Sequence, residues 1–314
     1  MVSHRVARAH LYVLVAEIMW GISAPVGKLV MNHGLNGLQL VTLRIAGSAV
    51  LFWVASLFVK PERVVPRDLA RLALAGLLAI GFNQTLFSVG LSLTSPINAT
   101  ILPTMMPVLT MFFAFLFLHE PISWLKAGGI ALSMGGALLM VWHSSQGMQA
   151  QAGNAEGDLL ILMAQFCFAL YLTLFRDVLH RYGGITCMKW MFTFSLVLVV
   201  PFTGQSFRSF EWSGHEPEFW WGIAYIVIMC TFLCYLLLMA GQQVLRPTLV
   251  SIYNYVQPVV SCLLSVAIGM AVFGLYHAAA IVLVALGVVC VARSKSRAQQ
   301  LAEQETDSPH NPRP

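Results

Sequence analysis

One carboxylate, Glu17, stands within a long apolar stretch near the start of the chain. A charged side chain at the centre of a bilayer costs about 2.5–3.5 kcal/mol on insertion scales, so Glu17 is expected to face a bundle interior or water. On a helix with 3.6 residues per turn, Glu17 and Lys28 share one face but lie roughly 16 Å apart, too far to pair directly. Two interpretations follow. Glu17 binds a cationic group or carries a coupling proton whose pKa is raised by burial, or it is a structural carboxylate bonded to a neighbouring helix.

Two basic side chains, Lys28 and Arg44, also fall within apolar stretches, near the expected outer ends of the first two helices. Long basic side chains in such places can extend to the membrane interface. Together they are also suited to a carboxylate or phosphate that enters from outside. Both interpretations stay open at this point.

Other polar and aromatic side chains lie in the middle of apolar stretches, where an amide or hydroxyl needs a partner. Hydrogen bonding between helices is one explanation, and the walls of a substrate cavity are the other. Proline removes a helical hydrogen bond and frees a carbonyl, which suits a hinge or a ligand, so we assign that role to Pro103, Pro107 and Pro258. The predicted cavity residues are Glu17, Trp20, Lys28, Asn83, Gln84, Thr104, Phe168, Tyr171, Tyr235, Tyr253, Asn254 and Gln257.

The pair Glu120 and Pro121 indicates a structural turn between two helices. Proline is favoured in the first turn of a helix, and a carboxylate at that end is stabilised by the helix dipole. We therefore interpret Glu120 and Pro121 as structural residues.

The elements that must position these residues follow from composition. Of 314 residues, 58% are hydrophobic and only 10% are Asp, Glu, Lys or Arg, which excludes a water-soluble globule. The basic residues fall in short breaks between apolar runs and form no stripe, so we expect no nucleic-acid partner. The sequence predicts an all-α integral membrane protein whose ten helices span approximately residues 10–30, 39–59, 71–91, 97–118, 123–143, 158–177, 184–203, 218–239, 248–269 and 275–293.

Orientation follows from the Lys and Arg residues. A cytoplasmic N-terminus places 15 of the 18 on the inner side and only Arg208 on the outer side. Both termini are therefore predicted to be cytoplasmic. The predicted order is a cytoplasmic N-terminus at 1–9, a five-helix repeat at 10–143, an outer connector at 144–157, a second five-helix repeat at 158–293 and a disordered cytoplasmic tail at 294–314.

The two halves resemble each other at a fixed spacing. An offset of 151 residues pairs Pro96 with Pro247, Pro107 with Pro258 and Gly136 with Gly287, and an offset of 148 pairs Trp20 with Phe168. Because five helices is an odd number, the halves must cross the membrane in opposite senses. Inverted repeats can open a central site to either side in turn, which is the property a secondary transporter needs.

The chain resembles the EamA-type members of the drug/metabolite transporter superfamily over roughly residues 10–293. The resemblance implies ten helices in two inverted repeats, with a cavity lined by helices 1, 3, 4, 6, 8 and 9, and the export or exchange of small metabolites, often amino acids. The second half departs from the family pattern, because Ala271 stands where many relatives have an acid matching Glu120. The residues that carry the resemblance are the run Glu17–Lys28, Arg44, Asn83–Gln84, the stretch from Gly90 to Ala99, Pro103, Pro107, the stretch from Phe117 to Trp124, and Gly128, Gly129, Gly135 and Gly136.

We therefore expect a carrier of a small molecule, most simply an amino acid or similar zwitterion moved outwards across a bacterial cytoplasmic (inner) membrane. A coupling proton is possible, the oligomeric state is open, and membrane lipid is the surrounding partner. An exchanger of nucleotide sugars or sugar phosphates is the alternative within the superfamily, although it needs more cavity cations than Lys28 and Arg44. An intramembrane enzyme is the rival from another class, but His119-Glu120 lacks the second His of a metalloprotease motif and no serine-hydrolase elbow occurs. No cofactor is expected, and no metal, since the six cysteines lack zinc-site spacing.

Overall fold

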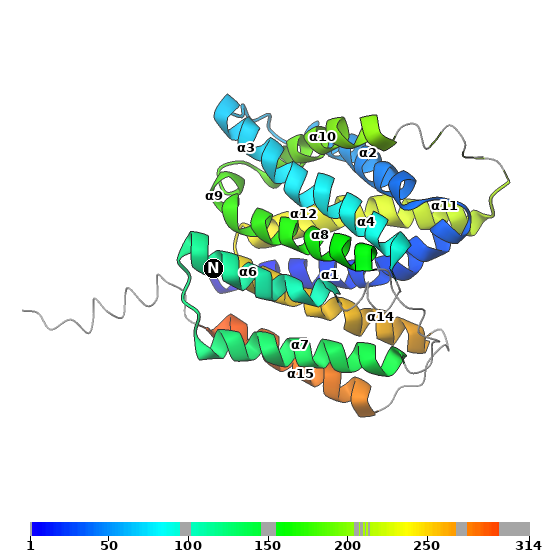
Figure 1. Cartoon of the computed structure of the whole chain (residues 1–314). Coiled ribbons are helices and arrows are strands. Elements are labelled where there is room, and N and C mark those ends of the chain that lie inside the picture. Colours follow the sequence, from blue (N-terminus) through cyan, green and yellow to red (C-terminus); the bar gives the residue numbers. More distant parts are fainter. Residues whose placement is uncertain are drawn as a thin grey trace, which may run out of the picture.

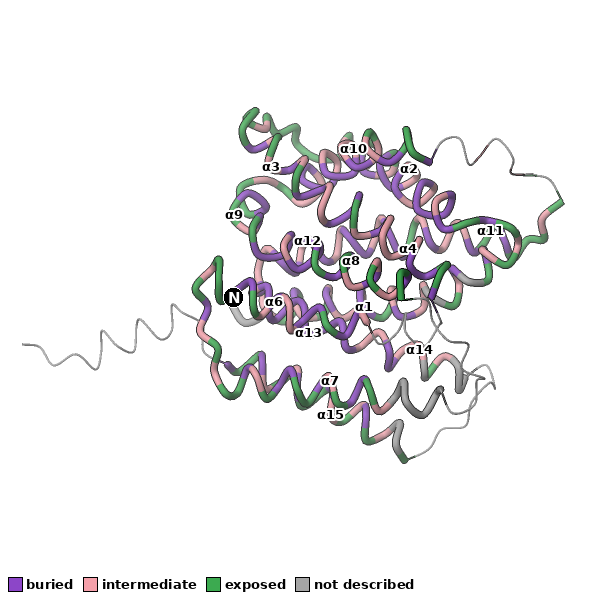
Figure 2. The backbone as a smooth tube through the Cα atoms, in the orientation of Figure 1, coloured by how far each residue is buried: buried purple, intermediate pink, exposed green. Residues whose placement is uncertain are grey.

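The structure is a computed structural model that describes residues 2–94, 102–145, 155–203, 207, 210, 212, 214–267 and 275–294. Within these residues every regular element is a helix, and the helices run roughly parallel or antiparallel to one another in a bundle (Figure 1). Figure 2 shows buried residues along the inner helices and exposed ones along the outer faces.

The first half of the described chain contains five rods, a rod being one continuous helical stretch. The third rod changes from α-helix to π-helix and back, and the fourth begins as a 3₁₀ turn. The elements are α1 (Val2–Asn32), α2 (Gly37–Ser56), α3 (Pro66–Gly76), η1 (Leu77–Phe82), α4 (Asn83–Leu93), η2 (Leu102–Met105), α6 (Met106–Leu118) and α7 (Trp124–Ser145).

The second half of the described chain repeats this series, again with a π-helical stretch in its third rod and a 3₁₀ turn in its fourth. A four-residue helix follows its first rod. The elements are α8 (Ala155–Leu174), α9 (Arg176–Leu179), α10 (Gly184–Thr203), α11 (Pro217–Ala224), η4 (Tyr225–Leu233), α12 (Cys234–Gln242), α13 (Pro247–Ile252), η5 (Tyr253–Tyr255), α14 (Val256–Ala267) and α15 (Leu275–Arg293).

Several rods are long and apolar enough to cross a membrane. Six meet both criteria among the described residues, and three shorter apolar helices lie at 102–118, 124–139 and 278–293. The all-α membrane fold is thus confirmed, whereas the exact number of ten crossings stays a prediction. The helix predicted over 184–203 has those bounds, while α1 begins at Val2 and absorbs most of the expected N-terminal extension.

The two halves form an inverted repeat, as the sequence predicts. The third rod runs from α3 to α4 in one direction, and its counterpart runs from α11 to α12 in the other (Figure 1). Hydrogen bonds repeat as well: Ser48 Oγ donates to the Val227 carbonyl, and Ser195 Oγ donates to the Gly76 carbonyl. The acceptors, Gly76 and Val227, are 151 residues apart, and the donors, Ser48 and Ser195, are 147 apart, so the same contact occurs twice with the halves exchanged.

Two pairs of equivalent residues touch each other, which places them beside the two-fold axis that relates the halves. Gln84 Nε2 donates to the Tyr235 hydroxyl at 3.1 Å, and Ser133 Oγ donates to the Val284 carbonyl at 3.2 Å. The partners in both bonds are 151 residues apart. The axis therefore passes through the centre of the bundle and between α7 and α15.

The α7–α15 crossing is close because small residues lie in it. A Cβ added to Gly136 would lie 2.8 Å from the Ala280 carbonyl oxygen, and one on Gly287 would lie 2.4 Å from the Gly129 carbonyl oxygen. Small residues allow helix backbones to approach closely in membranes. This crossing joins the last rod of each repeat.

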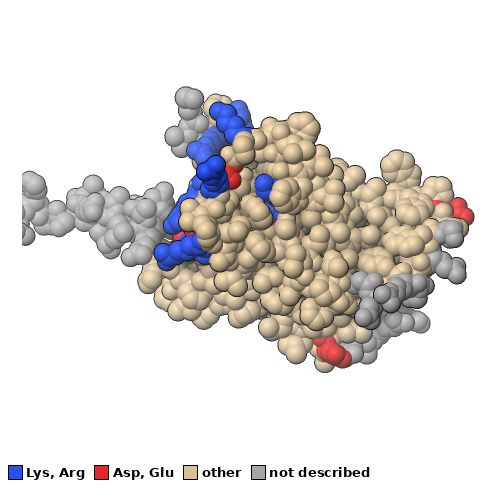
Figure 3. Space-filling view, turned by 90° about the horizontal axis from the view of Figure 1, so that it is seen from above, with Lys and Arg blue, Asp and Glu red and all other residues tan. Residues whose placement is uncertain are grey.

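Charged side chains gather at the ends of the rods. In the face shown in Figure 3, Lys and Arg cluster at the end where α3 begins and α9 lies, and only acidic side chains mark the opposite end. Two ion pairs join the repeats at the basic end: Arg71–Asp177 at 2.6 Å and Arg181–Asp68 at 3.2 Å. The predicted tail from Lys295 onwards, most of the connector (146–154) and Arg208 lie outside the described residues.

Candidate functional site

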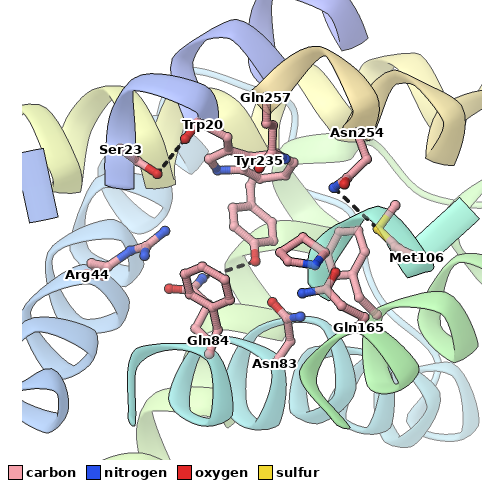
Figure 4. A pocket seen from close by; sticks show the side chains of 13 residues that line it. Trp20, Ser23, Arg44, Asn83, Gln84, Met106, Gln165, Tyr235, Asn254 and Gln257 are labelled. Atoms are coloured by element: carbon pink, nitrogen blue, oxygen red, sulfur yellow. Dashed lines mark hydrogen bonds between the residues drawn. The ribbon is translucent and has the colours of Figure 1, made fainter. Parts of the chain in front are cut away.

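A central cavity of about 90 Å³ lies among the rods of both repeats. Figure 4 shows the Arg44 side chain on one side of it and Gln165 and Asn254 on the other, with Tyr235 between them. Its lining residues are Trp20, Ser23, Arg44, Asn83, Gln84, Phe87, Pro103, Met106, Gln165, Phe168, Tyr235, Asn254 and Gln257. Seven of the twelve predicted cavity residues are among them: Trp20, Asn83, Gln84, Phe168, Tyr235, Asn254 and Gln257.

Local irregularities of the helices position several of these side chains. The π-helical stretches η1 and η4 end directly before Asn83 and before Cys234, one residue from Tyr235. The 3₁₀ turns η2 and η5 hold Pro103 and Asn254. π-Helical turns are rare and frequent at functional sites, because they redirect side chains and leave backbone groups for other partners.

Gln84 presents an unpaired oxygen. Its Nε2 donates to the Tyr235 hydroxyl, which in turn donates to the Ala79 carbonyl at 2.9 Å. Because that hydroxyl has given its proton to Ala79, it can only accept from Gln84, and this fixes the orientation of the amide. Gln84 Oε1 is then buried with no hydrogen-bond partner.

Asn254 presents a second such oxygen. Its Nδ2 lies 3.7 Å from the Met106 sulfur, and its Oδ1 is buried without a hydrogen-bond partner. A buried acceptor left unpaired costs about 1–3 kcal/mol, so each of these oxygens is poised for a donor.

Arg44 supplies positive charge to the cavity wall. Its Nε donates to the Thr231 hydroxyl at 3.0 Å, and this bond holds the side chain of α2 against η4. The expectation from sequence placed Arg44 near an outer helix end, whereas the structure brings its guanidinium to the central cavity. The bond to Thr231 is the physical reason, since it turns the side chain inwards.

Glu17 lies behind the cavity wall and is only 1% exposed. Its Oε2 accepts a hydrogen bond of 2.6 Å from Gln257 Nε2, and Gln257 itself lines the cavity. Glu17 is therefore separated from the cavity by one side chain.

Three further predicted cavity residues, Tyr171, Tyr253 and Thr104, do not line the cavity. The Tyr171 hydroxyl accepts from Gln242 Nε2 at 2.5 Å, and the Tyr253 hydroxyl is bonded to His10 Nδ1 at 2.8 Å. Both bonds hold the rings among other helices. Thr104 is buried within η2 but does not line the cavity. Lys28 belongs to α1, and its side chain lies outside the described part of the chain.

Four lining residues were not predicted: Ser23, Phe87, Met106 and Gln165. Gln165 carried a usable signal, because the offset of 148 that pairs Trp20 with Phe168 also pairs Glu17 with Gln165. Met106 and Phe87 carried no such sequence signal, because an apolar residue that lines a cavity looks in the sequence like any other apolar residue of an apolar helix.

The three prolines differ in position. Pro103 lines the cavity from η2, Pro107 lies in the first turn of α6, and Pro258 lies in the first turn of α14. Proline is tolerated in a first turn because its missing N–H would be unpaired there in any case. The irregular backbone lies just before each of these two helices, in η2 and η5.

Glu120 and Pro121 lie at one end of the bundle, far along the rods from the cavity. Glu120 Oε2 accepts from Lys126 Nζ at 3.0 Å and from the Thr248 hydroxyl at 2.9 Å. All three side chains are buried. The hydrogen bonds of Glu120 thus connect the turn before α7 with Thr248 in α13 of the other repeat. The equivalent position, Ala271, lies outside the described residues.

Comparison with known proteins identifies the family. The model of the EamA-like transporter family matches residues 7–142 and again residues 155–293. The chain belongs to the EamA-like transporter family. The double match divides the chain at the same region as the inverted repeat does.

Relatives of this EamA-like transporter carry transporter names. It is 26% identical to Uncharacterized transporter YyaM of Bacillus subtilis, over 68% of this chain and 70% of that protein. It is 24% identical to Uncharacterized transporter YcxC of the same organism, over 92% of this chain and 94% of that protein. A protein named Probable terminal-alkyne amino-acid exporter, from Streptantibioticus cattleyicolor, is 23% identical over 63% of this chain and 64% of that protein.

A solved crystal structure shares the fold of this EamA-like transporter. Its TM-score is 0.73 at 17% identity, and the match covers 95% of this chain and 99% of that one. This likeness concerns the fold alone. The chain is thus a multi-pass membrane transporter.

Proposed function

We propose that this transporter moves a small zwitterion, most simply an amino acid, outwards across a bacterial cytoplasmic membrane by alternating access. The observation that carries the proposal is the central cavity, where the Arg44 guanidinium lies on one side and Asn254, with its unpaired amide oxygen, on the other.

The chemistry of the two sides suits the two ends of a zwitterion. A guanidinium binds a carboxylate through charge-assisted and often paired hydrogen bonds. Asn254 Oδ1, across the cavity from Arg44, is a buried acceptor without a partner that an ammonium group would satisfy (Figure 4). Trp20 and Phe168, whose ring centroids are 6.3 Å apart, add apolar walls for a side chain.

The size of the cavity favours a small solute. Its volume of about 90 Å³ is well below the roughly 300–1,000 Å³ of sites for drug-sized ligands. Of the described residues that line it, Arg44 alone carries a permanent positive charge. A nucleotide sugar would need more room and more cations for its phosphates.

The inverted repeat supports the mechanism. Two halves with the same backbone can exchange conformations around a central site and open it first to one side and then to the other. The concentration of Lys and Arg at the end where α9 lies supports a cytoplasmic location for that end and for both termini. The name of the Streptantibioticus relative, an amino-acid exporter, agrees with the proposed substrate class and direction.

Glu17 is the proposed coupling group. In the present conformation Gln257 covers it, while its counterpart in the second repeat, Gln165, lines the cavity. Exchange of the two conformations would bring Glu17 to the cavity and remove Gln165 from it. A carboxylate that is covered in one state and uncovered in the other can carry one proton per cycle.

Counterflow tests the proposal. The purified protein is reconstituted in vesicles preloaded with one amino acid, and uptake of radiolabelled amino acids or nucleotide sugars is followed with and without a pH gradient. Accumulation of an amino acid, and no accumulation of nucleotide sugars, is expected. Accumulation of nucleotide sugars alone would contradict the proposed substrate class, and hydrolysis of a lipid or peptide without solute movement would favour an enzyme.

A further inference from the structure

Thr231 is a buried residue of η4 whose hydroxyl connects the π-helical backbone with Arg44 of the other repeat. Its Oγ1 donates to the Ile226 carbonyl at 2.8 Å and accepts from Arg44 Nε at 3.0 Å. A hydroxyl has one proton, so an oxygen that has given its proton to Ile226 can only accept from the guanidinium. Thr231 is therefore a fixed acceptor for Arg44 Nε.

The direction of this hydroxyl depends on the π-helical turn. In the α-helix α6, Thr110 Oγ1 donates to the Met106 carbonyl, four residues earlier, at 2.9 Å. Thr231 lies within η4 and donates to a carbonyl five residues earlier. A π-helix is bonded between residues five apart, so its turn moves the acceptor by one position. The π-helical stretch that packs against α2 thus sets the acceptor of Arg44.

The equivalent contact in the other half of the molecule is apolar. The offset of 151 pairs Thr231 with Ile80 in η1, and the spacing of 147 between the two donor serines pairs Arg44 with Met191. Ile80 and Met191 are both fully buried, and α10 packs against η1 as α2 packs against η4. Packing of the second rod on a π-helical stretch therefore does not require a polar pair, and the Arg44–Thr231 bond needs another explanation.

The bond to Thr231 determines which edge of the guanidinium is open. A guanidinium can offer paired N–H groups from Nε and one Nη, or from its two Nη atoms. Nε is bonded to Thr231, and no other hydrogen bond joins the guanidinium to the described residues. Arg44 lines the cavity and points into it (Figure 4), so the end with Nη1 and Nη2 is the edge left for a solute.

An arginine held in this way discriminates between acceptors. A carboxylate has two oxygens that accept from two parallel N–H groups. A carboxamide has one oxygen and an NH₂ group, and the protons of that group would meet those of the guanidinium. A guanidinium that is free to rotate can avoid this clash and offer a single N–H to the carboxamide oxygen. One that is fixed at Nε cannot.

We propose that Thr231 is a positioning residue that determines specificity: it fixes Arg44 end-on, so that the transporter selects solutes with a free carboxylate over the corresponding carboxamides. The role of Thr231 rests on the proposed function, because it requires that Arg44 binds the carboxylate of the solute.

Counterflow with competitors tests the proposal. The half-saturating concentration of an amino acid active in counterflow, and inhibition by its own carboxamide, are measured for the wild type, Thr231→Val and Thr231→Ser. Thr231→Val keeps the shape and removes the hydroxyl. It is expected to raise the half-saturating concentration about tenfold, to leave the maximal rate unchanged and to reduce the preference for the amino acid over its carboxamide. Thr231→Ser keeps the hydroxyl and should restore both properties.

Two further variants serve as controls. Thr173 is a buried threonine of α8 that does not line the cavity, and its Oγ1 donates to the Ala169 carbonyl of its own helix at 3.0 Å. Thr173→Val is therefore the matched control and should leave the kinetics unchanged. Thr231→Val combined with Arg44→Met should be no worse than Arg44→Met alone, because a residue that acts through Arg44 has no effect once Arg44 is absent.

The contrary outcomes are distinct. A lower maximal rate with an unchanged half-saturating concentration, an unchanged preference over the carboxamide, or a full additional loss in the Arg44→Met background would overturn the role of Thr231. An effect of Arg44→Met without one of Thr231→Val would contradict that role alone. Kinetics unaffected by Arg44→Met would contradict the proposed function as well.

Discussion

The two repeats carry the same backbone irregularities at equivalent positions: a π-helical stretch in the third rod and a 3₁₀ turn in the fourth. Their side chains at the cavity differ. The spacing of 147 between Ser48 and Ser195 pairs Arg44 with Met191, Gln84 corresponds to Tyr235, and Glu17, behind the cavity wall, corresponds to Gln165. A symmetric backbone gives two conformations of similar energy, and unlike side chains give the cavity one positive side. The backbone of the two repeats thus accounts for the change of conformation, and the cavity side chains account for recognition of the solute.

The largest expected effect concerns the buried ion pair of the first repeat, Lys126–Glu120. Lys126→Met leaves the buried Glu120 carboxylate with the Thr248 hydroxyl as its hydrogen-bond donor, and removing one member of a buried pair costs about 3–5 kcal/mol. A large fall in the thermal midpoint in detergent is expected. Lys60→Met, at an exposed lysine, is the control and should leave the midpoint unchanged.

A second substitution sharpens this prediction. Combining Lys126→Met with Glu120→Gln removes the uncompensated charge, so part of the lost stability should return. If the double variant were as unstable as Lys126→Met, the cost would come from packing and not from charge.

The next effect concerns Arg44, the permanent cation among the described residues that line the cavity. Arg44→Met gives the first repeat the residue that the second repeat has at the equivalent position, and removes the proposed carboxylate partner. Losing a charged partner of this kind costs about 2 kcal/mol or more, so the half-saturating amino-acid concentration in counterflow should rise about thirtyfold. Met191→Leu, the control in the second repeat, should change it little. Similar kinetics for both variants would contradict the assigned role of Arg44.

A smaller effect is expected at the contact between the last rods of the repeats. A Cβ at Gly136 would meet the Ala280 carbonyl oxygen at 2.8 Å, whereas at Gly135 nothing lies within 4 Å. Gly136→Ala should lower the stability by about 1–3 kcal/mol. Gly135→Ala should leave it unchanged or raise it by up to about 1 kcal/mol, because alanine favours a helix. Denaturant titration of both variants measures the difference, and equal stability would contradict the close crossing.

The smallest effect on the maximal rate is expected at Glu17. Glu17→Gln gives both repeats the same residue and keeps a hydrogen-bonding group for Gln257. Counterflow should continue, but its dependence on pH between pH 5 and pH 8, as imposed in the assay, should flatten. Gln165→Glu, at the equivalent position, should instead retain a pH response. An unchanged pH profile in Glu17→Gln would remove Glu17 as the coupling group.

Features with a strong sequence signal were predictable. Apolar runs gave the membrane fold, and the matching prolines and glycines gave the offset of 151 residues, which now relates Gln84 to Tyr235 and Ser133 to Val284. Asn83, Gln84, Asn254 and Gln257 could be selected for the cavity because an amide is unusual in an apolar helix, and all four line it.

Side-chain direction was not predictable. Tyr171 and Tyr253 were expected at the cavity, but Gln242 and His10 hold them elsewhere, and those partners are distant in sequence. Arg44 turns inwards because Thr231 lies within 3.0 Å of its Nε, another contact that only the packing of two repeats creates. Gln165 could have been found by applying the repeat offset to Glu17.

The most direct test of the central claim is a pair of distances between the two repeats, measured by spin labels in lipid vesicles with and without substrate. One pair, at Arg67 and Leu174, reports on the basic end, and the other, at Ser92 and Glu218, reports on the opposite end. A solute active in counterflow is expected to shift the two distance distributions in opposite senses, one lengthening as the other shortens. Two distributions that stay fixed, or that lengthen together, would contradict an exchange of conformations between the repeats.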